Sequence, residues 1–173
     1  FDTLRARRDE YIYFRTDHHW TSLGAYYAYE QFAAAKGIEP SPLEEYTKVE
    51  YPNFIGSFYG ETQKNPNLAS NPDVVTAYIP QDTNKIIVTN QKGQTSEGNI
   101  ITNVSTWAAS SKYSTFIAGD NPYSVIVNDA VADDSACVVV KESFGNAFVP
   151  FLVSHYHTVH IIDYRYFAKV KQQ

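Results

Sequence analysis

A helical pattern of apolar positions stands out in residues 21–36 of the chain. Apolar side chains recur there close to helical spacing, and no proline interrupts them, as at Leu23, Tyr26, Tyr27 and Ala34. Thr21 or Ser22 can cap the start of this helix, and Gly37 is typical of its end. Upstream, the aromatic and β-branched run YIYF at 11–14 predicts a short strand. The polar residues in between therefore lie on a loop that joins a strand to a helix.

The middle of the chain changes from an irregular pattern to a strand-like one. Residues 38–72 contain five prolines and scattered aromatic residues, which predict an irregular excursion over the surface. Three strand-like segments follow, separated by polar turns, at 73–80, 85–90 and 98–103. Their spacing predicts a β-hairpin or meander. We interpret residues 73–103 as a small β-rich insertion in the main fold.

The last third has the pattern of a parallel β-α-β unit. Residues 114–128 hold two short apolar runs around a Gly-Asp-Asn-Pro turn. Segment 136–156 then begins as an apolar strand, passes through a Ser-Phe-Gly-Asn turn and continues as an apolar helix, before another apolar strand opens 158–167. Continuous apolar strands are typical of parallel sheets covered by helices. The predicted fold class is therefore α/β, with a parallel sheet flanked by helices.

Composition and charge narrow the range of functions without identifying one. The 173 residues, of which 43% are hydrophobic and 19% charged, suit one globular domain. A net charge of −5, with no basic cluster beyond RARR at 5–8, argues against a nucleic-acid partner. Cys137 is the single cysteine, so no intrachain disulfide can form. The chain holds no methionine, even at position 1, so we expect a processed form or a fragment of a longer protein.

Ser143 occupies a position that suits a nucleophile. It follows the apolar strand CVVVKE and precedes the predicted helix, at the strand end where open parallel sheets bind their ligands. Free backbone N–H groups at a helix start can stabilise an oxyanion, here those of Ser143, Gly145 or Asn146. From position alone, a serine that only caps the helix is the alternative.

The polar loop before the first helix can supply the base that such a serine needs. In the sequence DHHW, Asp17 and His19 alternate, so an extended segment would place both side chains on one side. Asp17 could then orient His19 while the other ring nitrogen turns toward Ser143. His18 would point elsewhere, to bond with the backbone or line the cleft, and it stays an alternative base. Trp20 could wall the cleft or pack in the core.

Two longer motifs resemble a known family. The stretch TDHHWTSLGAYYAY at 16–29, together with KESFGNAFVPFL at 141–152, resembles the bacterial DHHW protein family, and the ending DYRYF also fits. This family is similar to the SGNH-like O-acetyltransferases, including periplasmic proteins that acetylate alginate. The resemblance implies a single SGNH-hydrolase-like domain over residues 1–173. Family members are normally longer, so we expect the C-terminal part of a larger protein and a sheet that is incomplete.

The resemblance also implies roles for individual residues. In the alginate-acetylating relatives an Asp-x-His pair precedes the nucleophilic serine, which makes Asp17 the orienter, His19 the base and Ser143 the nucleophile. Those relatives place an arginine near the substrate, and Arg165 with its neighbour Tyr164 is the matching candidate.

The segment AGDN at 118–121 is similar to the Gly/Asn blocks of SGNH oxyanion holes. Asn121 is therefore a further candidate, with a plain turn residue before Pro122 as the alternative. The chain departs from the pattern at Glu142, where many SGNH proteins have aspartate.

The reaction implied by the resemblance is serine-dependent transfer of an acetyl group to or from a cell-envelope or extracellular polysaccharide. It needs no cofactor and no metal, and water as the acceptor would make the same site an esterase. The resemblance also implies an envelope-facing, membrane-anchored parent and an acetyl-exporting membrane protein as its partner.

Two other functions compete with acyl transfer. His155, His157 and His160 could join His18 or His19 around a zinc ion. Alternatively, the domain could keep the fold without turnover and serve as a polysaccharide-binding or envelope scaffold, which its 14 tyrosines would also suit.

Overall fold

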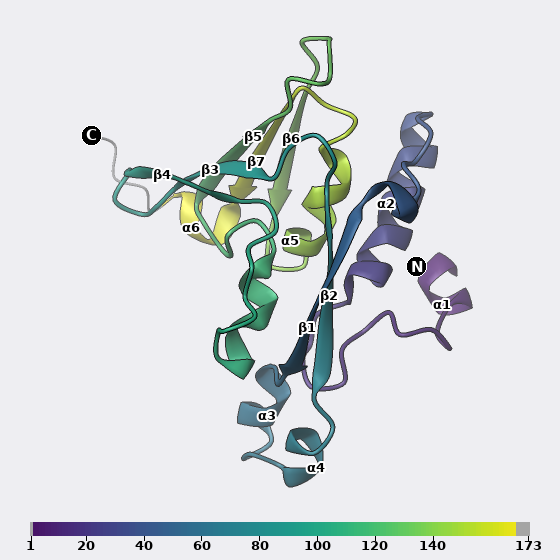
Figure 1. Cartoon of the computed structure of the whole chain (residues 1–173), viewed down its shortest axis with the longest axis vertical. Helices are drawn as coiled ribbons and strands as arrows, with labels where there is room; N and C mark the ends of the chain where they lie inside the picture. The colour runs from purple at the N-terminus through teal and green to yellow at the C-terminus, as the bar shows by residue number, and fades with distance from the viewer. Residues whose placement is uncertain (1, 169–173) are drawn as a thin grey trace.

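The computed structural model describes residues 2–168 of the chain, which form a mixed α/β fold. It contains a five-stranded sheet, a separate two-stranded sheet, one longer helix, α2, and several short helices (Figure 1). Among these residues, no helix combines the length and the apolar character needed to cross a membrane.

The five-stranded sheet has the order β4-β3-β5-β7-β6 and is mostly antiparallel. Its strands are β3 (Lys85–Thr89), β4 (Thr95–Asn99), β5 (Tyr123–Val127), β6 (Ala136–Lys141) and β7 (Thr158–Asp163). Only β6 and β7 run parallel, while β3–β4, β3–β5 and β5–β7 are antiparallel. The predicted parallel sheet is therefore wrong beyond that one pair. The short connection 90–94 between β3 and β4, for example, cannot carry the long crossover that parallel neighbours require.

The β6–β7 unit contains the predicted strand, turn, helix and strand. Its helical part is short, because α5 (Gly145–Phe148) gives way to the 3-10 helix η3 (Val149–Leu152). Pro150 stands in the first turn of η3, where a missing N–H does no harm. β6 and β7 thus end side by side, with Lys141 opposite Asp163.

The two-stranded sheet lies where an irregular excursion was predicted. β1 (Thr47–Phe54) pairs antiparallel with β2 (Asp73–Ile79), and the small helices α3 (Ser57–Glu61) and α4 (Pro66–Ala69) connect them. Most side chains of β1 are exposed or partly exposed, so the strand has no strong apolar alternation, and Pro52 suits a strand with a free edge. The prediction of an irregular 38–72 was therefore wrong.

The segment 73–103 does not form one continuous meander. β3 and β4 make the predicted hairpin, but β2 pairs with β1 and β3 pairs with β5. The hairpin therefore extends the main sheet. The strand predicted at 11–14 is likewise reduced to a single bridge between Tyr13 and Trp20, although Ile12 and Phe14 are buried as in a strand.

Helix α2 (Ser22–Lys36) confirms the helical prediction at both ends. The Thr21 hydroxyl caps it by accepting from the Gly24 N–H, and Gly37 closes it with a φ of 69°, a left-handed conformation that glycine adopts without strain. Its buried face packs Tyr26 and Tyr29 against Phe151 of η3. This contact ties α2 to the β6–β7 unit.

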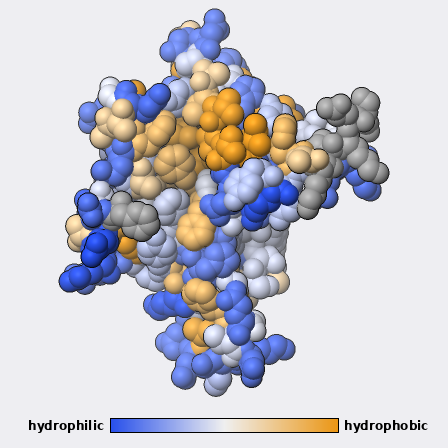
Figure 2. Space-filling view, turned by 180° about the vertical axis from the view of Figure 1, so that it is seen from behind, coloured by the Kyte–Doolittle hydropathy of each residue, from blue (hydrophilic) through white to orange (hydrophobic). Residues whose placement is uncertain are grey.

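One face of the five-stranded sheet stays apolar and exposed. Figure 2 shows strongly apolar side chains gathered on the face seen from behind. The exposed apolar residues at outward positions of the strands are Ile87, Val127, Val138 and Val140. The strands are thus apolar on both faces, which explains why their sequences have the pattern of a sheet covered on both sides.

Gly24 is required by the close approach of α2 to the preceding segment. A Cβ at this position would lie 2.4 Å from Ile12 O and 3.2 Å from Trp20 Cβ. We therefore expect Gly24→Ala to lower the free energy of unfolding by about 1–3 kcal/mol, because the backbone must shift. Gly60→Ala is the control, since nothing lies within 4 Å of its added Cβ, and it should stay within about 0.5 kcal/mol. Urea unfolding followed by tryptophan fluorescence measures both, and equal effects would contradict the packing argument.

Candidate active site

The DHHW loop, residues 17–20, is held from both ends. The buried carboxylate of Asp73, at the start of β2, accepts from Thr16 N–H (2.8 Å), the Thr16 hydroxyl (2.6 Å) and Arg15 N–H (3.2 Å). Thr21 N–H donates to Ile12 O at 3.0 Å, which closes the chain after the loop. The loop therefore has little freedom to move its side chains.

Ser143 lies on the turn between β6 and α5. Gly145 N–H donates to Glu142 O (3.1 Å), and Asn146 N–H donates to Ser143 O (3.2 Å). Gly145 has to be small, because a Cβ there would lie 2.6 Å from Lys141 Cβ. Its N–H is used within the turn, which differs from the predicted oxyanion role. Among the described residues, the Ser143 N–H has no hydrogen-bond partner.

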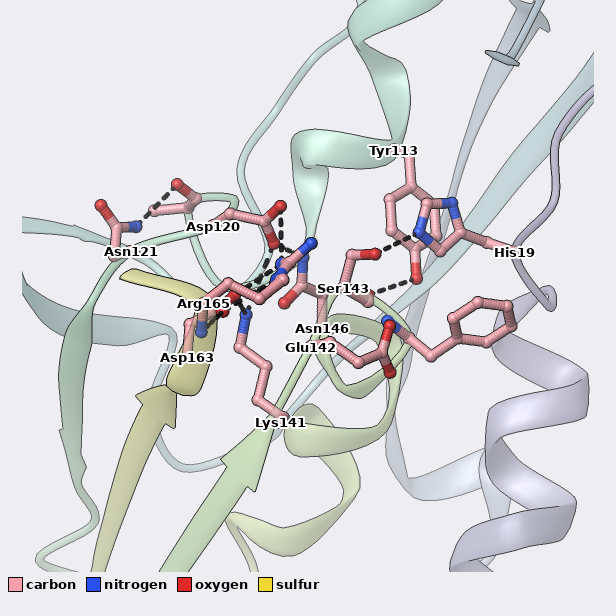
Figure 3. A network of polar contacts seen from close by, with 12 residues as sticks. His19, Tyr113, Asp120, Asn121, Lys141, Glu142, Ser143, Asn146, Asp163 and Arg165 are labelled. Carbon is pink, nitrogen blue, oxygen red and sulfur yellow. Dashed lines mark hydrogen bonds and ion pairs between the residues drawn. The ribbon is translucent and has the colours of Figure 1, made fainter. Parts of the chain in front are cut away.

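Asp17, His19 and Ser143 form a continuous chain of hydrogen bonds. His19 Nδ1 lies 2.5 Å from Asp17 Oδ1, and His19 Nε2 lies 2.8 Å from Ser143 Oγ. Figure 3 shows the His19 ring beside the Ser143 hydroxyl. Asp17 and His19 are buried, and Ser143 is partly buried. An ionised carboxylate only accepts, so Nδ1 carries the ring proton and Nε2 is free to accept from the serine hydroxyl.

The environment of Asp17 keeps its side chain ionised. Burial by itself raises the pKa of Asp17, but hydrogen bonds from the His19 ring and from Ser57 N–H outweigh that effect and lower the pKa to about 2. The Ser57 N–H donates to Asp17 Oδ2 at 2.8 Å. Gly56 allows this approach, since a Cβ there would lie 2.2 Å from Asp17 Cβ. Both carboxylate oxygens are therefore engaged.

Aromatic rings enclose the His19 imidazole. Tyr113, from the 3-10 helix η2 (Ala109–Thr115), stacks on it with a centroid distance of 3.9 Å and an interplanar angle of 12°. The His18 ring lies 4.0 Å away and the Phe144 ring 5.0 Å away. His18 is exposed, and its Nδ1 lies 2.7 Å from Ser57 Oγ. The base is thus shielded while its Nε2 stays directed at Ser143.

An ionic network adjoins the turn at 142–144 that carries Ser143, which we call the nucleophile turn. Arg165 donates to both oxygens of Asp163 (2.9 and 2.6 Å) and pairs with Asp120 Oδ2 at 3.0 Å. Buried Lys141 donates to Asp163 at 2.8 Å, and Asn146 Nδ2 donates to Asp120 Oδ1 at 2.8 Å. Burial raises the pKa of Asp163, but its bonds from Arg165 and Lys141 lower it overall. Figure 3 shows these side chains converging beside Ser143.

These groups surround a polar cleft of about 330 Å³. The cleft is lined by residues from the DHHW loop, β1, η2 and the turn after it, the turn of Ser143, α5 and α6 (Tyr164–Phe167). These residues are Asp17, His18, His19, Phe54, Ser110, Tyr113, Ser114, Gly119, Asp120, Ser143, Asn146 and Arg165. Larger clefts lie elsewhere on the surface, but this one contains the hydrogen-bonded chain and is therefore the candidate site.

Comparison with known proteins identifies the family. Residues 1–162 match the DHHW protein family. The chain belongs to this family. A solved DHHW family protein from Eubacterium siraeum DSM 15702 is 32% identical with a TM-score of 0.86, and the match covers 96% of this chain and 55% of that one. No curated protein matches the chain at significant similarity.

Two structures of PatB1 from Bacillus cereus share the fold. Their TM-scores are 0.70 and 0.69 at 23% and 25% identity, with 93% of this chain covered in both. The first of the two carries a sulfonyl adduct. The matches cover 54% and 56% of the PatB1 chains, so this DHHW family chain spans about half the length of its solved relatives.

Of the ten residues predicted for the site of this DHHW family chain, six line the cleft, and Gly145, Asn121, Tyr164 and Trp20 do not. Asn121 donates its amide to Ala118 O (3.1 Å) in a turn and does not line the cleft, whereas its neighbour Asp120 does. Tyr164 is 59% exposed at the start of α6 and is also outside the cleft. Trp20 donates its Nε1–H to Phe144 O at 3.0 Å, so it supports the nucleophile turn from outside the cleft.

Several site residues were missed in the sequence. Tyr113 and Ser57 lie in short helical segments that no sequence pattern predicts, and the strand pattern that begins at Asp73 does not indicate a role for its carboxylate. Asp120 lies inside the motif AGDN, in which the resemblance points to Asn121 and not to the aspartate. None of these residues has a sequence spacing that links it to the DHHW motif.

The alternative zinc site of histidines is not assembled. His155 Nε2 bonds with Tyr29 OH (2.5 Å), His160 Nδ1 with Tyr123 OH (2.7 Å), and His157 Nδ1 with Thr158 Oγ1 (3.0 Å). Among the described residues, the group whose ligand atoms approach within 4.8 Å is Asp17, His18 and His19. In this group the Asp17 carboxylate also accepts from His19 and from Ser57 N–H.

The lowered pKa of Asp17 predicts a pH-dependent contribution to stability. Because folding lowers this pKa from 3.8 to about 2, the ionised carboxylate stabilises the fold above about pH 4, and this contribution is lost as the pH falls toward 2. We expect it to amount to about 2 kcal/mol. Asp17→Asn should therefore lose less unfolding free energy than wild type across this interval.

Urea unfolding at a series of acidic pH values measures this difference. Asp129→Asn is the matched control, because the Asp129 side chain is 96% exposed. Wild type and Asp129→Asn should fall in parallel as the pH drops. If Asp17→Asn followed the same curve as both, the carboxylate would not be held as described.

Proposed function

We propose that this chain carries out serine-dependent acyl transfer, with an acetyl group moved to or from a hydroxyl of a cell-envelope or extracellular polysaccharide. In this proposal the domain is of the SGNH-like O-acetyltransferase type, Ser143 is the nucleophile, His19 the base and Asp17 the orienter. The activity of the whole parent protein is part of the same proposal, because the chain spans about half the length of its solved relatives.

One observation carries the proposal: the unbroken chain from Asp17 through His19 to Ser143 Oγ, with contacts of 2.5 and 2.8 Å. A structural serine at a turn does not need a histidine whose other nitrogen is bonded to a buried carboxylate. That arrangement is how serine enzymes activate a hydroxyl. The sulfonyl adduct on PatB1 adds support, because a sulfonyl group attaches covalently to a nucleophile.

In the first half of the reaction, His19 Nε2 takes the proton of the Ser143 hydroxyl as Oγ attacks the carbonyl carbon of the acyl donor. The carbonyl oxygen becomes an oxyanion, for which the Ser143 N–H and the Asn146 amide are the proposed donors. The bond to the leaving group then breaks, and the His19 imidazolium returns the proton to that group. Ser143 is left acylated.

In the second half, a sugar hydroxyl gives its proton to His19 Nε2 and attacks the acyl carbonyl. Collapse of this second oxyanion releases Ser143 Oγ, which takes the proton back from His19. Water in place of the sugar would complete ester hydrolysis instead. Asp17 stabilises the imidazolium in both halves, and general-base help of this kind contributes about 10²–10⁴ in rate.

The setting of the reaction is proposed on family grounds. We place the parent protein on the envelope-facing or extracellular side, anchored in the membrane, with a membrane protein that exports acetyl groups as its partner. Arg165 and the exposed His18 line the cleft and are the proposed contacts for the acceptor.

The test is acylation of the protein by an activated acetyl ester, followed by intact mass and peptide mapping. Wild type should gain one acetyl group on the peptide that contains Ser143, and Ser143→Ala should gain none there. His19→Ala should be labelled more slowly by about 10²–10⁴, because the hydroxyl then has no base. A sulfonyl fluoride run in parallel should label the same residue.

Ser96→Ala is the control, since Ser96 is an exposed serine on β4, outside the cleft. It should be acylated at the wild-type rate. If folded wild type took up neither reagent, or if Ser143→Ala were labelled equally well, the non-catalytic polysaccharide-binding domain would be the better account.

A further inference from the structure

Tyr113 contacts both His19, the proposed base, and Ser143, the proposed nucleophile. Its ring stacks on His19 at 3.9 Å and 12°, and its hydroxyl donates to Ser143 O at 3.0 Å. Figure 3 shows the Tyr113 ring lying over the imidazole, with its hydroxyl at the nucleophile turn. Among the described residues, this side chain reaches the base and the nucleophile from a third segment of the chain, η2.

The ring restrains a motion that the bond to Asp17 leaves open. A single hydrogen bond at Nδ1 fixes one atom of the imidazole but still allows the ring to tilt. Tyr113 on one face, with His18 at 4.0 Å, fixes the ring plane, so that Nε2 points at Ser143 Oγ. The electron-rich face of the tyrosine also attracts the imidazolium that forms during acyl transfer.

The hydroxyl restrains the other partner. Ser143 O accepts from both Tyr113 OH (3.0 Å) and Asn146 N–H (3.2 Å), and the next carbonyl, that of Phe144, accepts from Trp20 Nε1. Two successive carbonyls of the nucleophile turn are therefore held from two sides. These bonds fix the backbone from which the Ser143 side chain projects, and the contact with His19 Nε2 then orients Oγ.

The core keeps Tyr113 itself in place. The residue is 8% exposed, and its ring meets Phe14 edge-on at 6.1 Å and Phe116 at 5.2 Å. It therefore offers a fixed contact to both the His19 ring and the Ser143 carbonyl.

We propose that Tyr113 is the positioning residue of the site, which aligns the His19 base with the Ser143 nucleophile through its ring and its hydroxyl. This inference rests on the proposed function, since alignment matters only where the two groups react. Tyr113 itself transfers no proton and touches no reacting atom.

The kinetic test follows sulfonylation of Ser143 by a sulfonyl fluoride at saturating reagent, in which Oγ bonds to the sulfur and fluoride leaves. Tyr113→Phe keeps the ring and loses the hydroxyl bond, so its first-order rate constant should fall about 3- to 10-fold. Tyr113→Leu also loses the stack and should fall about 100-fold. The reagent concentration at half-saturation should stay within about twofold in both variants, since positioning acts on the reactive step. If Tyr113→Phe keeps most of the rate constant that Tyr113→Leu loses, the contribution of the stacked ring is separated from that of the hydroxyl.

Tyr123→Phe is the matched control. Tyr123 also stacks on a histidine, His160, and bonds with it at 2.7 Å, but it lies on β5 outside the cleft. Its rate constant should equal that of wild type. Equal rate constants for wild type and folded Tyr113→Leu, or a loss that appears only in the half-saturation concentration, would overturn the proposal.

A second measurement does not depend on turnover. Proton NMR of the His19 ring N–H bonded to Asp17 should give a low-field signal in wild type and Tyr113→Phe that is broadened or lost in folded Tyr113→Leu. If wild type shows this signal yet reacts with no reagent, the proposed function fails while the positioning role is still decided. An unchanged signal in Tyr113→Leu overturns the role itself.

Discussion

The buried carboxylate of Asp73 is the constraint on which the site depends. It accepts hydrogen bonds from both Arg15 N–H and the backbone and side chain of Thr16, directly before the DHHW motif. A buried charge is costly unless such donors satisfy it, so the segment before the motif has one favourable position. Asp17 and His19 follow this segment directly, so its position also sets theirs. Because the site joins residues 124 apart in the sequence, at His19 and Ser143, an anchored loop is the condition for their contact.

A second buried group fixes the opposite side of the cleft. Lys141 and Asp163 lie opposite each other at the ends of the parallel strands β6 and β7, and Arg165 extends the pair to Asp120. Ion pairs of this kind add little net stability, because desolvation offsets most of the attraction. Their effect is geometric: they join the ends of two strands to Asp120 in the turn after η2, and through Asp120 to Asn146 of α5. Two separate polar groups, Asp73 and the Lys141–Asp163 pair, thus hold the DHHW loop and the turn after η2 at the two sides of the cleft.

Sequence patterns correctly predicted those helices and strands whose local residue preferences match the packing around them in the structure. Helix α2 has a cap, a stop and an apolar face, and all three were visible in the sequence. Strand β1 was missed because it pairs only with β2 and leaves most side chains exposed, so no alternation marks it. The direction of the strands was misjudged because β3, β5 and β6 are apolar on both faces. That pattern predicts coverage by helices, whereas Val138 and Val140 remain more than half exposed in this chain.

The sequence by itself determined the family and the chemical parts of the site: the DHHW motif, a serine at the end of an apolar strand, and the arginine of the DYRYF segment. Residue type and local position are sufficient for these, since a cap, a turn or a short motif is encoded within a few residues. Only the tertiary structure decided that His19 meets Ser143, that Tyr113 stacks on the base, and that Asp120 rather than Asn121 faces the cleft. Those contacts depend on how strands pair and how rings pack over long sequence separations, and no local pattern records either.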